Sequence, residues 1–187
     1  MIALVIWRSG KNLDHICLHL QEDLTLIYMW CKKWGFVINT DKTQGIIFTN
    51  KHINNNEIKL KIGDKFVKFH SSVKLLGIYF DKKLTWKSHI ESLVERSKTG
   101  LNLMRAISGT TWGGNKNTLL MIYKSFILSK LDYSSFMYSN CSKSLSKKLD
   151  TIQYKSLLIA TGGLKGTSLK ALLSECGETP LYLRRKN

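Results

Sequence analysis

The sequence predicts an α+β fold in which short strands and one long helix precede a bundle of helices. Apolar residues recur at three- and four-residue spacing along residues 13–34, which is typical of an amphipathic helix. Short runs rich in branched and aromatic residues follow in residues 36–80, separated by turn-forming residues as strands are. Helical spacing returns after residue 85 and continues nearly to the end of the 187-residue chain. We therefore expect two parts, residues 1–84 and 85–187, each large enough for a small domain.

A buried strand and a long helix are predicted at the beginning of the chain. Residues 2–7 (IALVIW) form a continuous apolar run of the length of a buried strand. The helix over residues 13–34 is expected to end at Gly35, because many helices end at a residue in the left-handed conformation, which glycine adopts without strain. We expect its apolar stripe to pack into a core and the opposite side, with Glu22 and Asp23, to face solvent.

Five short strands are predicted after this helix, at residues 36–38, 45–49, 58–62, 65–69 and 73–80. Asn and Asp residues between the first two favour a turn. Gly63-Asp64 suits a two-residue hairpin turn between the third and the fourth. Gly77 lies inside the fifth, where a glycine indicates a bulge or a close approach of the backbone to another group.

Four helices are predicted in the second half, at residues 85–108, 116–131, 144–160 and 168–176. Thr85 or Ser88 can cap the first, with Glu91 three residues after Ser88, and Gly109 can end it. Its predicted inner face comprises Ile90, Leu93, Val94, Leu101 and Met104, and that of the second comprises Leu119, Leu120, Tyr123, Phe126 and Ile127. The predicted arrangement is a helical bundle with a shared apolar core.

The charge of the chain favours a polyanionic partner. Lys and Arg total 29 against 13 Asp and Glu, a net charge of +16. Residues 1–80 contribute 11 − 6 = +5 and residues 81–187 contribute 18 − 7 = +11. Such a field attracts nucleic acid first and an anionic membrane surface second. The candidate nucleic-acid-binding residues are Lys82, Lys83, Lys87, Arg96, Lys98 and Arg105, which can neutralise phosphates without reading sequence; the alternative for each is a solvated helix face.

The sequence predicts no metal site, no cofactor and no membrane span. The acidic residues are thinly spread, whereas two-metal chemistry needs carboxylates that converge on metals about 3.5–4 Å apart. The four cysteines form no CxxC pair and are expected to be buried thiols of an intracellular protein, in the nucleus or the cytoplasm. Apolar runs shorter than 18 residues do not cross a bilayer, and the apolar start is too short for a signal peptide.

Four segments resemble the reverse transcriptases of non-LTR retrotransposons. WGFVINTDKTQGIIFT at 34–49 resembles their motif D region, with a Trp-Gly turn before an Asn-x-x-Lys-Thr element. VKLLGIYFDKKLTWKSHI at 73–90 resembles the motif E region that follows. LDTIQYKSLLIATGG at 149–163 and SECGETPLYLRR at 174–185 are similar to later blocks of the same polymerases. The order and spacing of the four segments carry more weight than any one of them.

This resemblance implies a role for each half of the chain. Residues 1–84 would form the end of a palm, with motifs D and E and a primer-grip hairpin, and residues 85–187 a helical, thumb-like bundle. Lys42 matches the motif D lysine, which would approach the phosphates of the incoming nucleotide. Leu75, Leu76 and Gly77 match the primer grip, where a glycine allows close approach of the backbone. The implied partners are an RNA template and a DNA primer, and the complete polymerase would use Mg²⁺.

The resemblance also implies that the catalytic aspartates lie outside this chain. In the family, a strand like residues 2–7 follows a Tyr-x-Asp-Asp turn, and Met1 stands in the place of the second aspartate. We therefore expect a polymerase fragment that lacks upstream segments and is inactive alone. The alternatives are a non-enzymatic nucleic-acid-binding module and, third, a basic domain that docks on an acidic protein or membrane surface. Steep salt-dependent binding without primer extension would fit both the polymerase fragment and the nucleic-acid-binding module.

Overall fold

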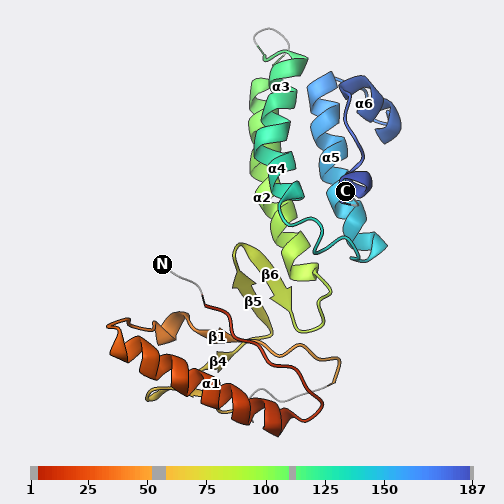
Figure 1. Ribbon diagram of the computed structural model, residues 1–187. Coiled ribbons are helices and arrows are strands. Elements are labelled where there is room, and N and C mark those ends of the chain that lie inside the picture. The colour runs from red at the N-terminus through yellow and green to blue at the C-terminus, as the bar shows by residue number, and fades with distance from the viewer. Residues whose placement is uncertain (1–3, 52–57, 110–112, 186–187) are drawn as a thin grey trace. The chain divides into compact units, whose positions relative to one another are not determined.

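In the computed structural model, the described residues are 4–51, 58–109 and 113–185 (Figure 1). Helices and short strands are mixed, as predicted for an α+β fold. The chain forms two compact units, Met1–Val73 and Lys74–Asn187. This division falls before the predicted change near residue 85, because the strand Ile78–Asp81 packs against the first helix of the second unit. The assignment of palm and thumb to the two parts stays a prediction.

The long helix of the first unit is confirmed as α1, Leu13–Lys33. The side chain of Asn12 caps it by accepting a hydrogen bond from the backbone N–H of Asp14 at 2.9 Å. Gly35 follows its end with φ of +73°, the left-handed conformation in which glycine is least strained. The predicted end at Gly35 is confirmed, whereas the cap at Asn12 was not predicted from the sequence.

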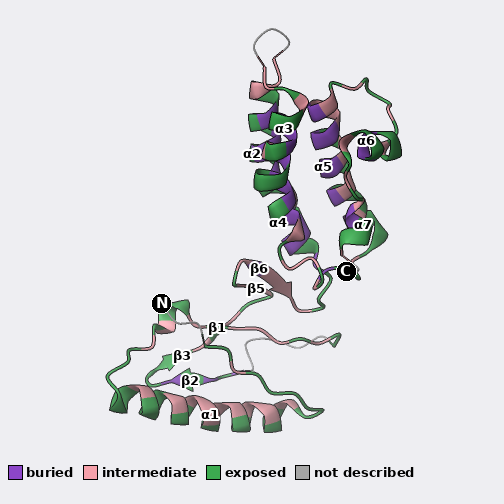
Figure 2. Ribbon diagram, turned by 45° about the horizontal axis from the view of Figure 1, so that its top comes forward, coloured by how far each residue is buried: buried purple, intermediate pink, exposed green. Residues whose placement is uncertain are grey.

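The apolar stripe of α1 packs less deeply than predicted. Every residue of α1 is described and none is buried, so the helix is drawn without purple in Figure 2. Among the described residues of this unit, the buried core consists of Ile58, Leu60 and Ile62. So small a core leaves the stripe half-buried. The Gln21 side chain adds a polar contact: it accepts from the backbone N–H of Lys61 at 2.8 Å and donates to its carbonyl at 3.0 Å.

The strands of the first unit are shorter than predicted. They are β1 (Gln44–Gly45), β2 (Lys61–Ile62), β3 (Lys65–Phe66) and β4 (Lys68–Phe69). β2 and β3 form the predicted antiparallel hairpin around Gly63, with Lys61 opposite Phe66 and Ile62 opposite Lys65. β1 and β4 pair in parallel. A 3₁₀-helix, η1 (Thr40–Lys42), precedes β1.

Two predicted strands are absent from the described residues. Residues 36–38 have no strand structure, and the side chain of Val37 is 94% exposed. Of the run at residues 2–7, the first two lie outside the described residues, and residues 4–7 are not a strand. Leu4 and Trp7 are exposed rather than buried. An apolar run becomes a strand only where a neighbouring strand satisfies its N–H and C=O groups, and none pairs with these described residues.

The predicted single strand at residues 73–80 is a hairpin instead. β5 (Ser72–Leu75) and β6 (Ile78–Asp81) pair with each other and are joined by Leu76 and Gly77. Both joining residues have positive φ, +48° and +84°, as a type I′ turn requires. The interior glycine therefore marks a reversal of the chain, not a bulge.

The second unit is a helical bundle. Its helices are α2 (Lys87–Ile107), α3 (Lys116–Ile122), the π-helical η3 (Tyr123–Leu128), α4 (Ser129–Asp132), α5 (Lys143–Thr161), α6 (Leu169–Cys176) and α7 (Leu181–Arg184). α3, η3 and α4 follow one another without a break and together match the predicted helix at 116–131. Ser142 and Ser168 cap α5 and α6, and Gly162 and Gly177 end them in the left-handed conformation.

The core of the bundle lies between α2, the α3–α4 helix and α5, and is purple in Figure 2. The predicted inner faces are buried except for two residues: Val94 packs partly buried against the core, and Phe126 is 50% exposed. The wider π turn changes the phase of the helix, which explains why simple helical spacing misplaces Phe126. Gly100 permits the close contact of α2 with η3, because a Cβ there would lie 2.6 Å from Cγ1 of Ile127.

Candidate nucleic-acid interface

A basic groove runs between α2 and α5. It has a volume of about 370 Å³ and is lined by Val94, Lys98, Leu101, Asn102, Arg105, Lys148, Thr151, Ile152 and Lys155. Apolar side chains from both helices form part of the lining, together with two cationic side chains from each helix. Among the described residues that line the groove, none is acidic or aromatic.

Helical geometry explains why these cations gather. Lys98 and Arg105 are seven residues apart on α2, and Lys148 and Lys155 are seven apart on α5. Seven residues make nearly two turns, so each pair shares a face and is separated by about 10.5 Å along its axis. Along the axis of a duplex, each strand carries one phosphate every 3.4 Å or so. A pair aligned with that axis would therefore span roughly three phosphates of one strand.

The four cations differ in how far neighbouring groups neutralise them. The ammonium of Lys98 contacts Glu95 at 2.6 Å, and that of Lys148 contacts Glu91 at 3.3 Å. The guanidinium of Arg105 donates to the neutral amide of Asn102 at 2.8 Å, which leaves its charge uncompensated. Among the described residues, no carboxylate forms an ion pair with Arg105 or Lys155, so these two present the most available charge.

The structure separates the candidate residues predicted from the sequence. Lys87, Lys98 and Arg105 lie within about 20° of one line along α2. Arg96 lies about 180° away, and the ammonium of Lys130 on α4 contacts its backbone carbonyl at 3.4 Å. It is therefore not part of the groove.

Lys82 and Lys83 precede α2 in the turn after β6, and neither lines the groove. Lys148 and Lys155 were missed in the sequence, although their seven-residue spacing on a predicted helix was a usable signal.

The turn before α2 is organised by Asp81. Its carboxylate accepts hydrogen bonds from the backbone N–H groups of Lys83, Thr85 and Trp86 at 3.2, 2.9 and 2.8 Å, and from the Thr85 hydroxyl at 3.1 Å. Thr85 and Ser88 were predicted as caps, but the residue before the helix is Trp86, in a left-handed conformation with φ of +64° and no cap of its own. Asp81 therefore takes the place of a cap residue, because its carboxylate accepts from backbone N–H groups of the turn that leads into α2.

Trp86 and His89 anchor the start of α2 in the core. The Trp86 ring is buried against Phe80, with centroids 5.7 Å apart. His89 is buried beside Tyr138, with centroids 5.3 Å apart, and its Nδ1 accepts from the backbone N–H of Tyr79 at 3.4 Å. Burial lowers the pKa of His89, so its neutral form is favoured in the folded protein. Asp81, Trp86 and His89, which belong to the segment that resembles motif E, thus have a structural role.

The predicted primer-grip residues occupy the β5–β6 hairpin. Leu75 is half-buried at the end of β5, and Leu76 and Gly77 form the turn. The side chain of Leu76 is 72% exposed at the tip. Its backbone carbonyl accepts a hydrogen bond from the hydroxyl of Tyr133 at 2.9 Å.

Lys42 belongs to the first unit, at the end of η1. The side chain of Asn39 accepts from the backbone N–H of Lys42 at 3.1 Å, and the Thr43 hydroxyl donates to the carbonyl of Asn39 at 2.9 Å. The Asn-x-x-Lys-Thr element is therefore a self-capped turn. It leaves Lys42 exposed, while the neighbouring Asp41 contacts Lys65 at 3.5 Å.

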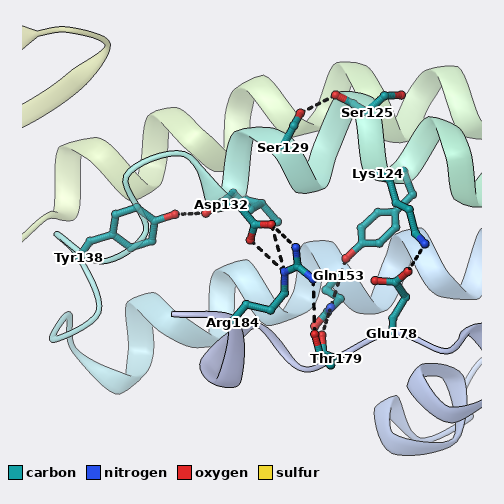
Figure 3. Close-up of polar contacts among 11 residues, drawn as sticks. Lys124, Ser125, Ser129, Asp132, Tyr138, Gln153, Glu178, Thr179 and Arg184 are labelled. Carbon is teal, nitrogen blue, oxygen red and sulfur yellow. Dashed lines mark hydrogen bonds and ion pairs between the residues drawn. The ribbon is translucent and has the colours of Figure 1, made fainter. Parts of the chain in front are cut away.

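Polar contacts fasten the C-terminal segment to the bundle (Figure 3). The single Nε–H of Arg184 is shared between the two carboxylate oxygens of Asp132, at 3.0 and 3.2 Å. Lys124 contacts Glu178 at 2.8 Å, and the buried Gln153 donates to the carbonyl of Thr179 at 3.1 Å. The SECGETPLYLRR segment therefore has a structural role, because its side chains and backbone hold the C-terminal segment on the bundle.

Cysteines occur in both units. All four are free and half-buried, whereas the sequence predicts buried thiols. Burial raises the pKa of Tyr138 to about 12, which makes it a poor acid or base near neutral pH. Within the described ranges, no group of three or more His, Cys, Asp or Glu residues could hold a metal ion. In the same ranges, no helix combines the length and the hydrophobicity of a membrane span.

Comparison with known proteins supports the resemblance found in the sequence. The chain is 27% identical over 143 residues to the RNA-directed DNA polymerase from mobile element jockey of Drosophila melanogaster. It is 24% identical over 127 residues to the Pol polyprotein from type-1 retrotransposable element R1 4 of Nasonia vitripennis. The chain resembles the RNA-directed DNA polymerases of non-LTR retrotransposons. A probable polymerase from transposon BS of D. melanogaster is 31% identical over 86 residues.

The jockey and R1 similarities cover most of this chain, and all three cover only a small part of each relative. The jockey alignment includes 76% of the chain and 15% of that polymerase, and the R1 alignment includes 68% and 32%. The BS alignment includes 46% of the chain and 10% of that protein. No protein-family model matches the chain, and no solved structure matches it.

Proposed function

We propose that the chain is the palm–thumb portion of an RNA-directed DNA polymerase of a non-LTR retrotransposon and that its α2–α5 groove binds a template–primer duplex. The polymerase relatives support the first part. The lining of the groove supports the proposed binding of a duplex, because four cations line it and none of its described lining residues is acidic. In this proposal residues 85–187 act as the thumb. Residues 1–84 form the end of the palm.

The chemistry of the groove favours the sugar–phosphate backbone over the bases. Lysine and arginine side chains neutralise phosphates regardless of sequence. Single-stranded bases are usually held by stacking on aromatic rings, and no aromatic side chain is among the described residues that line the groove. We therefore expect salt-dependent, sequence-independent binding of an RNA–DNA duplex.

Two further contacts complete this proposal. The exposed tip of the β5–β6 hairpin, formed by Leu76 and Gly77 after Leu75, would contact the primer. Lys42 would approach the phosphates of the incoming nucleotide, where a cation stabilises the negative charge that develops on the leaving group. The exposure of Lys42 on its capped turn supports that role. Mg²⁺ would serve the complete polymerase.

We also propose that these 187 residues do not extend a primer by themselves. Two-metal transfer requires carboxylates that converge on the metal ions. Six of the seven acids of the second unit are instead engaged with basic groups or backbone donors. Glu91, Glu95, Asp132, Glu175 and Glu178 each contact a lysine or arginine, and Asp81 organises the turn before α2.

The decisive experiment combines primer extension with a salt titration of binding. The chain is mixed with an RNA template annealed to a DNA primer, and extension with Mg²⁺ is measured beside affinity from 50 to 200 mM salt. We expect affinity to fall steeply with salt and no extension product. Extension by the chain alone would contradict the proposed inactivity, and salt-independent or absent binding would contradict the groove.

A non-enzymatic nucleic-acid-binding module would give the same result in that experiment. The two functions can be distinguished with a chimera in which this chain replaces the matching segment of a jockey-type polymerase. Extension by that chimera, above the level of a polymerase from which the segment is deleted, would favour the polymerase portion. A chimera no better than the deletion would favour the binding module.

A further inference from the structure

We infer that Tyr133 is a positioning residue that holds the tip of the β5–β6 hairpin in the orientation in which Leu76 meets the primer end of a bound duplex. This inference rests on the proposed function and deepens it, because it assigns the support of the hairpin to a residue far away in sequence. The hydroxyl of Tyr133 donates to the carbonyl of Leu76 at 2.9 Å, and its ring lies against Gly77, whose added Cβ would be 3.7 Å from Cε1.

The conformation of the tip points to a purpose other than folding. A type I′ turn with positive φ at both central residues is best served by Asn-Gly or Gly-Gly. Here the first position is Leu76, with φ of +48°, and a leucine is strained in that region. Packing does not offset this strain, because the side chain is 72% exposed. An exposed apolar residue in a strained turn is the kind of outlier found at ligand contacts.

Tyr133 is itself held firmly on the bundle. It is the residue directly after α4, and its backbone N–H donates to the carbonyl of Ser129 at 3.1 Å. The preceding Asp132 binds Arg184 at 3.0 Å (Figure 3). A continuous series of contacts thus leads from the C-terminal segment through the end of α4 to the hairpin tip. The ring of Tyr133 is exposed, so it contributes little to the core, and its hydroxyl serves the carbonyl of Leu76.

The test compares two RNA–DNA hybrids of equal length, one with a recessed DNA 3′ end and one blunt. Fluorescence anisotropy measures the affinity of the 187-residue chain for each, and thermal unfolding measures its stability. We expect the wild-type chain to prefer the recessed end. Tyr133→Phe removes only the hydroxyl, and we expect it to reduce this preference about 2- to 10-fold, the effect of one hydrogen bond. Its affinity for the blunt hybrid should stay unchanged, and its melting temperature should fall no further than the loss of one exposed hydrogen bond explains.

Two other variants complete the design. Tyr182→Phe is the matched control, because Tyr182 is similarly exposed and its hydroxyl has no hydrogen bond to any described residue; it should keep the preference. Leu76→Asn suits the turn but removes the apolar side chain, so it should fold and lose the preference. In that background Tyr133→Phe should have no further effect, because Tyr133 acts through Leu76.

Each alternative outcome has a distinct meaning. If the wild-type chain binds neither hybrid, the proposed function fails and this inference fails with it. Salt-dependent binding of both hybrids without preference would keep the groove and overturn the role of the hairpin tip. The role of Tyr133 is also overturned if Tyr133→Phe keeps the preference, or if it weakens the binding of both hybrids equally.

Discussion

The charge of the α2–α5 groove can be tested with one pair of substitutions. Arg105→Gln together with Lys155→Gln removes the two cations that form no ion pair with a described residue, whereas Lys98 and Lys148 each contact a glutamate. Each lost phosphate contact reduces the slope of log affinity against log salt by about 0.9 for a duplex. The double variant should therefore have a slope shallower by about 1.8. Between 50 and 200 mM salt, this corresponds to a loss of affinity about 12-fold smaller than for the wild-type chain.

A control of equal charge separates the groove from the general basicity of the chain. Arg96→Gln together with Lys170→Gln also removes two positive charges, from the far side of α2 and from α6. The assay is a titration of a labelled RNA–DNA hybrid at four salt concentrations, with far-ultraviolet circular dichroism to confirm folding. The control should keep a slope close to that of the wild-type chain. Equal effects of the two double variants would refute the groove as the binding site.

The remaining predictions concern stability and exchange. Asp81→Ala should lower the free energy of unfolding in urea by about 2–3 kcal/mol, because backbone donors before α2 lose their acceptor; a loss below 0.5 kcal/mol or so would mean that water replaces the carboxylate. Because burial lowers the folded-state pKa of His89, the unfolded chain takes up a proton first, and stability should fall as the pH drops below about 6.5. His89→Asn, which keeps an acceptor for Tyr79, should show a smaller loss of melting temperature between pH 7.5 and 5, and an equal loss would assign the effect to other groups. Amide hydrogens of α1 should exchange faster than those of α5, because no residue of α1 is buried; slower exchange in α1 would contradict this.

Helices were the part of the fold most accessible from the sequence. Asn12, Ser142 and Ser168 cap helices, and Gly35, Gly162 and Gly177 stand where helices end. These signals act within one or two turns, so they are visible in a local stretch of sequence. The hairpin around Gly63 was predictable for the same reason.

Strands were less accessible because they depend on partners. The runs at 2–7 and 36–38 have the composition of strands, yet their described residues pair with nothing. The run at 73–80 reverses direction at Gly77, although its hydrophobicity is continuous. Phe126 is misplaced because a π turn inserted by packing changes the phase of its helix.

The candidate site shows the same division. Lys98 and Arg105 were predictable as cations of an amphipathic helix, and Arg96 carries the same local signal although it lies on the other side of α2. Lys148 and Lys155 join the site only because α5 packs beside α2.

The sequence by itself determined the α+β composition, the ends of several helices, most of the inner faces of α2 and the α3–α4 helix, the excess of positive charge and the likeness to retrotransposon polymerases. Helical period and turn chemistry are local properties, and net charge is a sum, so neither requires knowledge of the fold. Only the tertiary structure decided which helices lie side by side, which cations stay unpaired, and which tyrosine supports the tip at Leu76. Those outcomes follow from packing between segments as far apart as Leu76 and Tyr133, whose contact no local pattern encodes.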